Sequence, residues 1–217
     1  MRIAITFISI FFIVPVAKSQ NATDIYYHVP FIPQPNGLFC WSSSISMILW
    51  WKENDDAQMC LKDALTPEDV AIHNDWWQKW FPEGLNYSDQ RPFKKWGFVT
   101  LAPSSFTIEK FKGMLEQSPL WICYNPCANP LQPCGNHAVV IVGMKGDGTE
   151  AGTTLIIHDP DDGSGVYPNS GVRDNNMPYS EFIKRLDTLA LELIDYDMSK
   201  HGGVQKEEIN FIAYIPK

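Results

Sequence analysis

The segment Gln34-Pro-Asn-Gly-Leu-Phe-Cys40-Trp41 joins a turn-forming sequence to a strongly apolar run. Apolar side chains recur there at helical spacing, and four serines between them allow close packing, so a helix is predicted over 40–52. Cys40 then lies in the first turn, where unsatisfied N–H groups and the helix dipole favour a thiolate. A lone cysteine in an apolar helix is usually a buried structural thiol, so Cys40 needs partners elsewhere to be a nucleophile.

A second motif, Gly135-Asn136-His137, opens the apolar run 138–143 about a hundred residues further along the chain. A histidine within reach of a thiolate can act as general base and then as acid for a leaving amine. Gln34 can offer its side-chain amide, together with the backbone N–H of Cys40, where an oxyanion forms. His137 alone would be an ordinary strand residue, but the three together predict acyl transfer through a thiol nucleophile.

The remaining pattern predicts helices first and strands afterwards. We expect helices over 66–80, 88–96, 107–117 and 179–187, strands over 119–124, 138–143, 153–158 and 211–215, and an extended lead-in over 20–33. A nucleophile-bearing helix packed against a later antiparallel sheet is an α+β fold, and a cleft between the two parts would bring Cys40 opposite His137. No repeat or long linker divides the chain, so a single domain over 20–217 is predicted.

Residues 1–19 have the pattern of a cleaved secretory signal. Arg2 supplies a positive start, residues 3–14 are apolar but too short to span a bilayer, and Ala17-Lys18-Ser19 places small residues at the cleavage site. Cleavage after Ser19 and a secreted or periplasmic protein are therefore predicted. An uncleaved anchor is the alternative, because Lys18 lies unusually close to the cleavage site.

The chain is acidic, with 25 Asp and Glu against 17 Lys and Arg and a net charge of −8. Removal of residues 1–19 takes away Arg2 and Lys18 and no acid, which makes the net charge about −10. Such a surface argues against nucleic acid and against anionic membranes as partners of the mature protein. The charge says little about the substrate.

The five cysteines are Cys40, Cys60, Cys123, Cys127 and Cys134. Thiols tend to pair in an oxidising compartment, and the odd count leaves one over, which suits Cys40 as the nucleophile. The other four allow three connectivities. We expect Cys127 to pair with Cys134, because a bridge would stiffen the Pro-rich loop between them, and this leaves Cys60 for Cys123.

A zinc site is the alternative use of these cysteines. Three sulfurs and an imidazole lie within fifteen residues, a set that zinc accepts: Cys123, Cys127, Cys134 and His137. Their spacing is not that of the usual paired short knuckles, and a metal would consume the histidine that the thiol needs. We therefore expect no metal and no other cofactor.

The two motifs resemble those of papain-like cysteine peptidases, and the resemblance spans roughly residues 26–160. Gln34, Cys40 and Trp41 match the glutamine, the nucleophile and the tryptophan that follows it, and Gly-Asn-His matches the histidine motif. The next strand closes with His158-Asp159-Pro160, where plant and lysosomal members usually carry an asparagine. An Asp-Pro at this place is similar to the bacterial branch, such as bacteriocin-processing peptidases and papain-like avirulence effectors of plant-pathogenic bacteria.

The resemblance implies a papain-like α+β fold and a role for each matched residue. Cys40 would be the nucleophile, and His137 the base that becomes the acid for the leaving amine. Asp159 would hold the tautomer and orientation of the imidazole, as a third triad member does. Gln34 would donate its side-chain amide to the oxyanion.

The third member has alternatives, since Asp161, Asp162 and Asn136 are close in sequence to Asp159 or His137 and an Asp-Pro is also a common turn. His158 is expected to point to the opposite face of its strand and to be structural.

Three features depart from the papain pattern. Residues 37–39 are Gly-Leu-Phe instead of the Gly-Ser that precedes the papain nucleophile. The distance from Ser19 to Cys40 is too short for a long inhibitory propeptide. The cysteines near His137 are not a papain feature.

The sequence therefore predicts a secreted cysteine peptidase that acts on a protein or peptide through a thioester, with a cognate inhibitor or immunity protein as a further partner. An amidase or transferase on the same triad, for example on cell-wall amide bonds, is one alternative. A non-catalytic binding module with the same shape is another, although such modules usually lose the cysteine or the histidine.

Overall fold

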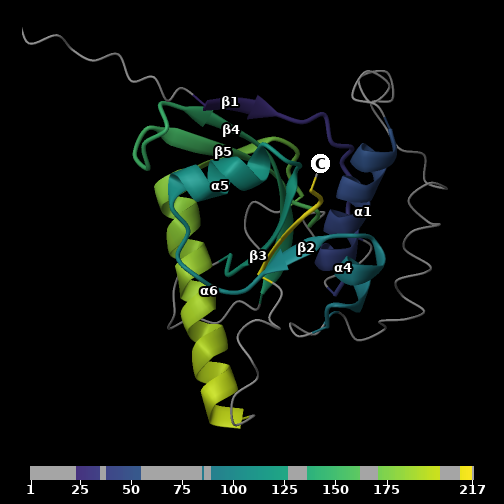
Figure 1. The fold of residues 1–217 in the computed structure, drawn as a ribbon, viewed down its shortest axis with the longest axis vertical. Coiled ribbons are helices and arrows are strands. Elements are labelled where there is room, and N and C mark those ends of the chain that lie inside the picture. The colour runs from purple at the N-terminus through teal and green to yellow at the C-terminus, as the bar shows by residue number, and fades with distance from the viewer. Residues whose placement is uncertain are drawn as a thin grey trace, which may run out of the picture.

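The computed structural model describes residues 23–34, 38–54, 85, 89–126, 136–161, 171–200 and 211–216, the side chains of 193–200 excepted. Its strands are β1 Thr23–Tyr26, β2 Val99–Leu101, β3 Leu120–Tyr124, β4 His137–Gly146, β5 Thr153–His158, β6 Asn175–Pro178 and β7 Ile212–Tyr214. Its helices are α1 Cys40–Glu53, α4 Arg91–Lys95, α5 Ile108–Leu115 and α6 Tyr179–Lys200. Figure 1 shows α1 and α6 on opposite sides of β3.

The strands form one seven-stranded sheet in the order β2-β7-β3-β4-β5-β6, and β1 pairs with β4 off this path. All of the pairings are antiparallel. β3 pairs with β4 over 137–141 and β1 pairs with it over 143–146, so β1 continues the same edge of β4. A helix bearing Cys40 is therefore packed on an antiparallel sheet, and the α+β prediction is confirmed.

Glycine is required where β1 pairs with β4. A Cβ atom at Gly143 would lie 2.5 Å from the carbonyl oxygen of Ile25, closer than any side chain tolerates. The register of β4 against β5 also shifts between Ile141 and Gly143. The missing side chain therefore lets the first strand join the sheet at a bulge.

Helix α1 packs on β3 and β4 with a buried face that combines large apolar side chains with four serines. Its serines at 42, 43, 44 and 46 are all buried. The Ser44 hydroxyl donates to the Ala138 carbonyl at 3.1 Å, and the Trp121 indole N–H donates to the Trp41 carbonyl at 3.2 Å. These contacts fix the helix on the sheet, and the helix predicted over 40–52 is confirmed, with one further residue at its end.

Aromatic side chains join the sheet to α5 and α6 on the side away from α1. The Phe111 ring packs edge-on against Tyr179 and Phe182, with centroids 5.8 and 5.5 Å apart. The Phe182 ring also lies 6.2 Å from Tyr124 of β3. Burial of these large rings supplies much of the apolar area that holds α6 to the sheet.

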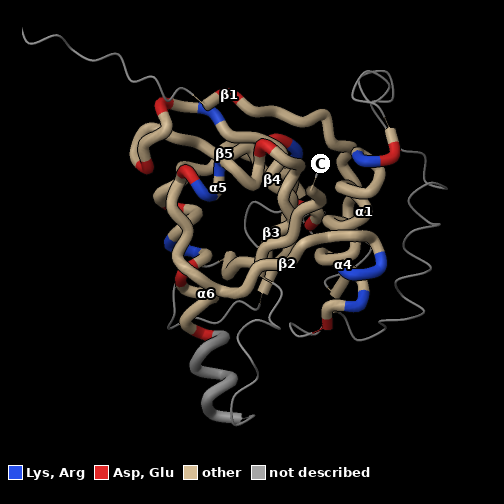
Figure 2. Tube along the Cα trace, viewed as in Figure 1, with Lys and Arg blue, Asp and Glu red and all other residues tan. Residues whose placement is uncertain are grey.

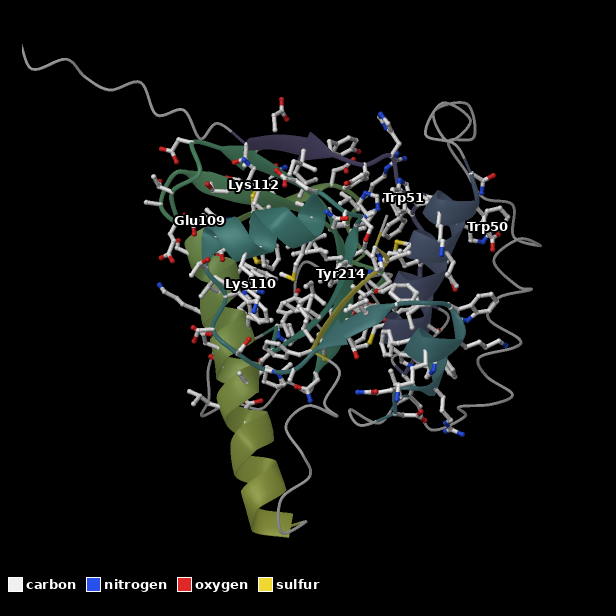
Figure 3. All side chains as sticks on the ribbon, viewed as in Figure 1. Trp50, Trp51, Glu109, Lys110, Lys112 and Tyr214 are labelled. Carbon is white, nitrogen blue, oxygen red and sulfur yellow. The ribbon has the colours of Figure 1, made fainter. Side chains whose placement is uncertain are left out.

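Apart from Asp159 and Asp161, the described Asp, Glu, Lys and Arg residues are not buried. Figure 2 marks such residues on α4, α5 and α6, whereas β3 contains none. Glu109 and Lys110 are exposed on α5, and Trp50 and Trp51 are partly buried near the end of α1 (Figure 3). Trp51 packs edge-on against Tyr27, with ring centroids 5.1 Å apart.

Most predicted elements are present, but three strands were missed. The strand predicted over 153–158 is confirmed, whereas the helix predicted over 179–187 extends to Lys200. The prediction was wrong for β2 and β6, which were not expected as strands, and β1 was expected only as an extended segment. β6 contains Asn and Pro, which have little strand propensity, and it forms because it pairs with the edge of β5.

Several predictions lie outside the described residues. They are the signal over 1–19 with cleavage after Ser19, the helix over 66–80, and the cysteines Cys60, Cys127 and Cys134. Among the helices that are described, none combines the length and the apolar character needed to cross a bilayer.

Candidate active site

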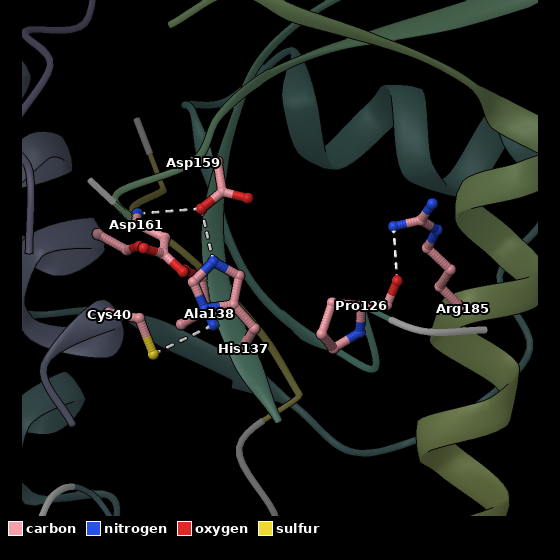
Figure 4. Close-up of polar contacts among 8 residues, drawn as sticks. Cys40, Pro126, His137, Ala138, Asp159, Asp161 and Arg185 are labelled. Carbon is pink, nitrogen blue, oxygen red and sulfur yellow. Dashed lines mark hydrogen bonds and ion pairs between the residues drawn. The ribbon is translucent and has the colours of Figure 1, made fainter. Parts of the chain in front are cut away.

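Three candidate side chains come from the ends of three elements. Cys40 is the first residue of α1, His137 is the first residue of β4, and Asp159 directly follows β5. Because β4 and β5 are antiparallel and Val140 pairs with His158, the start of β4 lies beside the end of β5. The packing of α1 on β4 adds the thiol, as Figure 4 shows.

The imidazole of His137 is bound to the carboxylate of Asp159. Nε2 of His137 lies 2.5 Å from Oδ1 of Asp159, and the two residues are 1% and 6% exposed. The backbone N–H of Asp161 donates to the same oxygen at 3.1 Å, and the N–H of Asp159 donates to the Val172 carbonyl at 3.2 Å. The Asp161 N–H therefore fixes the carboxylate, and the Val172 carbonyl fixes the backbone that carries it.

The thiol of Cys40 lies against the start of β4. Its Sγ accepts the backbone N–H of Ala138 at 3.4 Å, and its side chain also hydrogen-bonds to His137. Since Nε2 of the imidazole faces Asp159, Nδ1 is the nitrogen that remains for the thiol. Burial alone would lower the pKa of His137, but hydrogen bonds to Asp159 and Cys40, and their charges, raise it to about 10.

Gln34 is held beside this group by the turn that follows Asp159. Its backbone N–H donates to the Pro160 carbonyl at 2.6 Å, and the residue is 3% exposed. Within the described part of the chain, no group hydrogen-bonds to its side-chain oxygen. The backbone N–H of Cys40 belongs to the first turn of α1, where no intrahelical acceptor exists. Of the two groups that the sequence suggests as oxyanion donors, Gln34 is thus tied by its backbone to the segment after Asp159, and the N–H of Cys40 lies at the start of α1.

The alternatives to Asp159 are placed differently. Asp161 is fully buried and supports the Asp159 carboxylate with its N–H. Asp162 lies outside the described residues. The neighbouring histidine, His158, turns to another partner, since its Nε2 lies 3.1 Å from Oδ1 of Asp174. Burial lowers the pKa of His158 despite this carboxylate.

Two residues near the imidazole were missed by sequence reasoning. Tyr124 ends β3, and its ring centroid lies 6.2 Å from that of His137. Arg185 of α6 hydrogen-bonds to Tyr124, and its Nη1 donates to the Pro126 carbonyl at 2.8 Å. The strand and the helix were both predicted, but the register that pairs Tyr124 with His137 has no signal in a single sequence.

One predicted disulfide is not formed. Cys123 carries a free, buried thiol, so the structure does not contain the bridge to Cys60 that the sequence predicted. Cys123 pairs in register with Ala138, whose N–H binds Cys40, so its side chain is enclosed behind the candidate nucleophile. Burial, and then the charge of Cys40, raise the pKa of the Cys123 thiol.

No metal cluster is formed by the residues that the structure describes, taking three or more His, Cys, Asp or Glu side chains as the requirement. Two of the four residues of the zinc alternative, Cys127 and Cys134, lie outside those residues. Cys123 and His137 are described, and His137 is bound to Asp159 and Cys40.

Comparison with known proteins places the chain in a family. Residues 19–169, more than half of the chain and including all four candidate residues, match the family described as papain-like cysteine protease AvrRpt2. No curated protein matches the chain. A crystal structure of a double glycine motif protease from an AMS/PCAT transporter, in complex with the leader peptide, matches with 17% identity and a TM-score of 0.39, covering 90% of this chain and 99% of that one. The chain belongs to the AvrRpt2 family of papain-like cysteine proteases.

Proposed function

We propose that this cysteine protease hydrolyses peptide bonds with Cys40, His137 and Asp159 as its catalytic triad and Gln34 as an oxyanion donor. The observation that carries the proposal is the position of His137, which contacts the Cys40 thiol and the Asp159 carboxylate at once. A buried imidazole held between a thiol and a fixed carboxylate is the arrangement that nucleophilic acyl transfer needs.

The reaction begins with a proton on His137. Because the pKa of this imidazole is raised to about 10, the imidazolium persists at neutral pH and favours the thiolate of Cys40 beside it. The thiolate sulfur attacks the substrate carbonyl carbon, and the π electrons of the carbonyl move to its oxygen. His137 then gives its proton to the leaving nitrogen as the C–N bond breaks, which releases the amine and leaves a thioester.

The second half reverses the role of His137. The neutral imidazole takes a proton from water, and the resulting hydroxide adds to the thioester carbonyl. Collapse of that intermediate breaks the C–S bond, releases the carboxylic acid and restores the thiolate–imidazolium pair. Each proton that leaves His137 in the first half therefore returns to it in the second.

Asp159 orients the ring throughout the reaction. Its short contact with Nε2 holds the tautomer in which Nδ1 serves the thiol, and the N–H of Asp161 keeps the carboxylate in place. Gln34 is suited to the oxyanion because its backbone is tied to Pro160, next to Asp159, at 2.6 Å. The second donor is the N–H of Cys40 at the start of α1.

Export is part of the proposal. It is supported by the positive start, the apolar run and the small residues at the end of 1–19. Expression of the full chain in a secreting host, followed by mass determination of the released protein, is expected to give a mature chain that begins at Gln20. Retention of residues 1–19 on a cell-bound protein would contradict it.

The experiment for the enzyme uses the mature chain with an epoxysuccinyl or iodoacetamide probe and a peptide library. The wild type is expected to be labelled at Cys40 and to cut peptides into fragments with new carboxyl and amino termini. Cys40→Ala is expected to lose both properties. Cys123→Ala is the matched control, because it removes a free thiol from the adjacent strand, and it is expected to keep both.

Products distinguish the reaction class. Cleaved peptide bonds support the peptidase, whereas release of ammonia or transfer of the acyl group to an added amine would replace it with an amidase or a transferase. A wild type that is neither labelled nor active under native conditions would overturn the proposal.

A further inference from the structure

Tyr124 lies directly against the ring of His137. It is the last residue of β3, and its Cα pairs in register with His137 at the start of β4. The two ring centroids are 6.2 Å apart with an interplanar angle of 62°, and Tyr124 is only 3% exposed. An edge-on contact of this kind limits the orientations of the imidazole and keeps water from one of its sides.

Arg185 of α6 in turn holds Tyr124. Its guanidinium carbon lies 6.0 Å from the Tyr124 ring centroid, and the guanidinium also hydrogen-bonds to the phenol. Figure 4 shows its Nη1 donating to the Pro126 carbonyl, at 2.8 Å. The Arg185 carbonyl accepts the N–H of Asn125 at 3.5 Å. Residues 124–126, which end β3 and follow it, are therefore tied to α6 by the side chain and carbonyl of Arg185 and, through the Asn125 amide at 2.8 Å, by the carboxylate of Glu192.

We propose that Tyr124 and Arg185 are positioning residues that hold the imidazole of His137 against Asp159. The inference rests on the proposed function, because a fixed imidazole matters to turnover only if His137 transfers protons. Arg185 acts through Tyr124, and Tyr124 acts through His137. Helix α6 thus takes part in the reaction through one arginine at its inner side.

Charged and titratable groups reach the surroundings of His137 from several elements. They are Cys40 from α1, Tyr124 from β3, Asp159 and Asp161 after β5, and, beyond Tyr124, Arg185 of α6 with its ion-pair partner Glu181 at 2.6 Å. Burial first, and then the negative charge of Asp159, raise the pKa of Tyr124 against the opposing effect of Arg185. Tyr124 is therefore neutral at working pH, and its ring acts by shape and by excluding water.

Removal of the ring would expose the His137–Asp159 hydrogen bond to water. Entry of water reduces both effects on the pKa of His137, namely the desolvation that lowers it and the contacts with Asp159 and Cys40 that raise it. Because the contacts with Asp159 and Cys40 outweigh burial in the native protein, that pKa would move back from about 10 towards 6.5. The alkaline limb of the pH profile of kcat/KM reports the acid of the free enzyme, so it would move to lower pH.

The test is a graded series on these two residues with one matched control. Tyr124→Leu removes the ring, and Arg185→Met removes its support. Tyr124→Phe keeps the ring and removes the phenol hydroxyl. Arg185→Lys keeps the positive charge but lacks the planar guanidinium that contacts both Tyr124 and the Pro126 carbonyl. Lys184→Met is the control, because it removes one positive charge from the exposed residue that directly precedes Arg185 in α6.

Two measurements decide the outcome, namely the pH profile of kcat/KM and an NMR titration of the His137 ring. Tyr124→Leu and Arg185→Met are expected to lose about tenfold in kcat/KM and to shift the alkaline limb and the ring titration to lower pH. The conservative variants are expected to fall between these and the wild type, and Lys184→Met is expected to match the wild type.

If the variants lose stability but change neither the pH profile of kcat/KM nor the NMR titration of His137, Tyr124 and Arg185 are merely structural, and the inference is overturned. If Tyr124→Leu does not fold, Tyr124→Phe and Arg185→Lys still distinguish a positioning role from a structural one. A wild type that does not cleave peptides would defeat the proposed function alone, because the NMR titration of His137 reads the positioning of its ring without turnover. If the enzyme is active but the His137 titration is unchanged in the Tyr124 and Arg185 variants, the positioning role is wrong and the proposed function stands.

Discussion

Among the described residues, two buried histidines each contact an aspartate, and the differences between these pairs bear on the proposed role of His137. His137 and His158 are 1% and 0% exposed, and each places Nε2 on an aspartate oxygen, at 2.5 and 3.1 Å. The pKa of His137 is raised to about 10, whereas the pKa of His158 is lowered. Burial and a carboxylate partner are therefore not enough to charge an imidazole.

The carboxylates explain most of the contrast. The side chain of Asp159 is 9% exposed, whereas that of Asp174 is 42% exposed and also accepts the Tyr26 hydroxyl at 3.0 Å. Water screens the charge of Asp174, so burial outweighs it at His158. Arg173 next to Asp174 lowers the pKa of His158 further.

The second ring nitrogen completes the contrast. His137 has the thiol of Cys40 as a second partner. Nδ1 of His158 has no hydrogen-bond partner among the described groups, and the edge of the Phe31 ring lies nearby, with centroids 5.9 Å apart. In the described part of the chain, the imidazole of His137 thus lies between a thiol and a carboxylate, as the proposed proton transfer needs, whereas that of His158 contacts a carboxylate alone.

Loss of the imidazole is expected to give the largest effect. His137→Ala removes both the base and the acid, so kcat/KM should fall on the order of 10⁴-fold, without loss of the fold. His158→Gln keeps a polar group on Asp174 and is the matched variant in the second pair. Steady-state kinetics on a peptide substrate measure both variants. An equal loss of kcat/KM in His158→Gln would remove the distinction between the two His–Asp pairs.

Exchange of each carboxylate for an amide is expected to separate the pairs next. Asp159→Asn keeps an oxygen that can orient the ring but removes the buried charge, so kcat/KM should fall on the order of 10²-fold. Asp174→Asn removes a half-exposed charge and should cost less than about fivefold. Asp161→Asn tests the remaining candidate, and a complete loss there with Asp159→Asn silent would move the third member of the triad.

The sequence was enough to find three residues that the candidate site brings together, because Cys40, His137 and Asp159 each open or close an element. Cys40 begins an apolar helix, His137 begins a strand, and Asp159 ends one, so local patterns carry their positions. The partner of His158 could not be found in this way. Asp174 follows a segment with no strand pattern and has a positive φ of 57°, which no periodicity indicates.

Long-range register explains the other misses. Tyr124 meets His137 and Arg185 meets Pro126 only because β3, β4 and α6 pack in one particular alignment. The Cys60–Cys123 bridge was expected from counting alone, without knowledge that Cys123 faces inward behind Cys40. Counting gives the number of thiols that can pair and says nothing about where each one points.

The two histidines are expected to change stability with pH in opposite directions. The folded-state pKa of His137 lies above its unfolded value near 6.5, so its contribution is fully present below 6.5 and is lost as pH rises through about 10. His158 has a lowered pKa, so the unfolded chain binds its proton more strongly, and stability falls as pH drops below 6.5.

Urea unfolding between pH 5 and pH 10 measures this contrast in His137→Gln and His158→Gln. The difference in unfolding free energy between wild type and His137→Gln should shrink towards high pH. The corresponding difference for His158→Gln should shrink towards low pH. If both differences change in the same direction with pH, the pKa values of the two imidazoles are shifted in the same direction, and the contrast drawn from their carboxylates is wrong.

The smallest effect is expected from Tyr26→Phe, which removes one hydrogen bond from the more exposed carboxylate. The Tyr26 hydroxyl donates to Oδ1 of Asp174 at 3.0 Å in an exposed position, so the unfolding free energy should fall by about 0.5 kcal/mol. Its kcat/KM should equal that of the wild type, since the bond lies on the His158 side. His158 and Asp159 are consecutive, however, so a tenfold loss of kcat/KM would mean that the second pair holds the catalytic carboxylate through the backbone, and that the two pairs work as one.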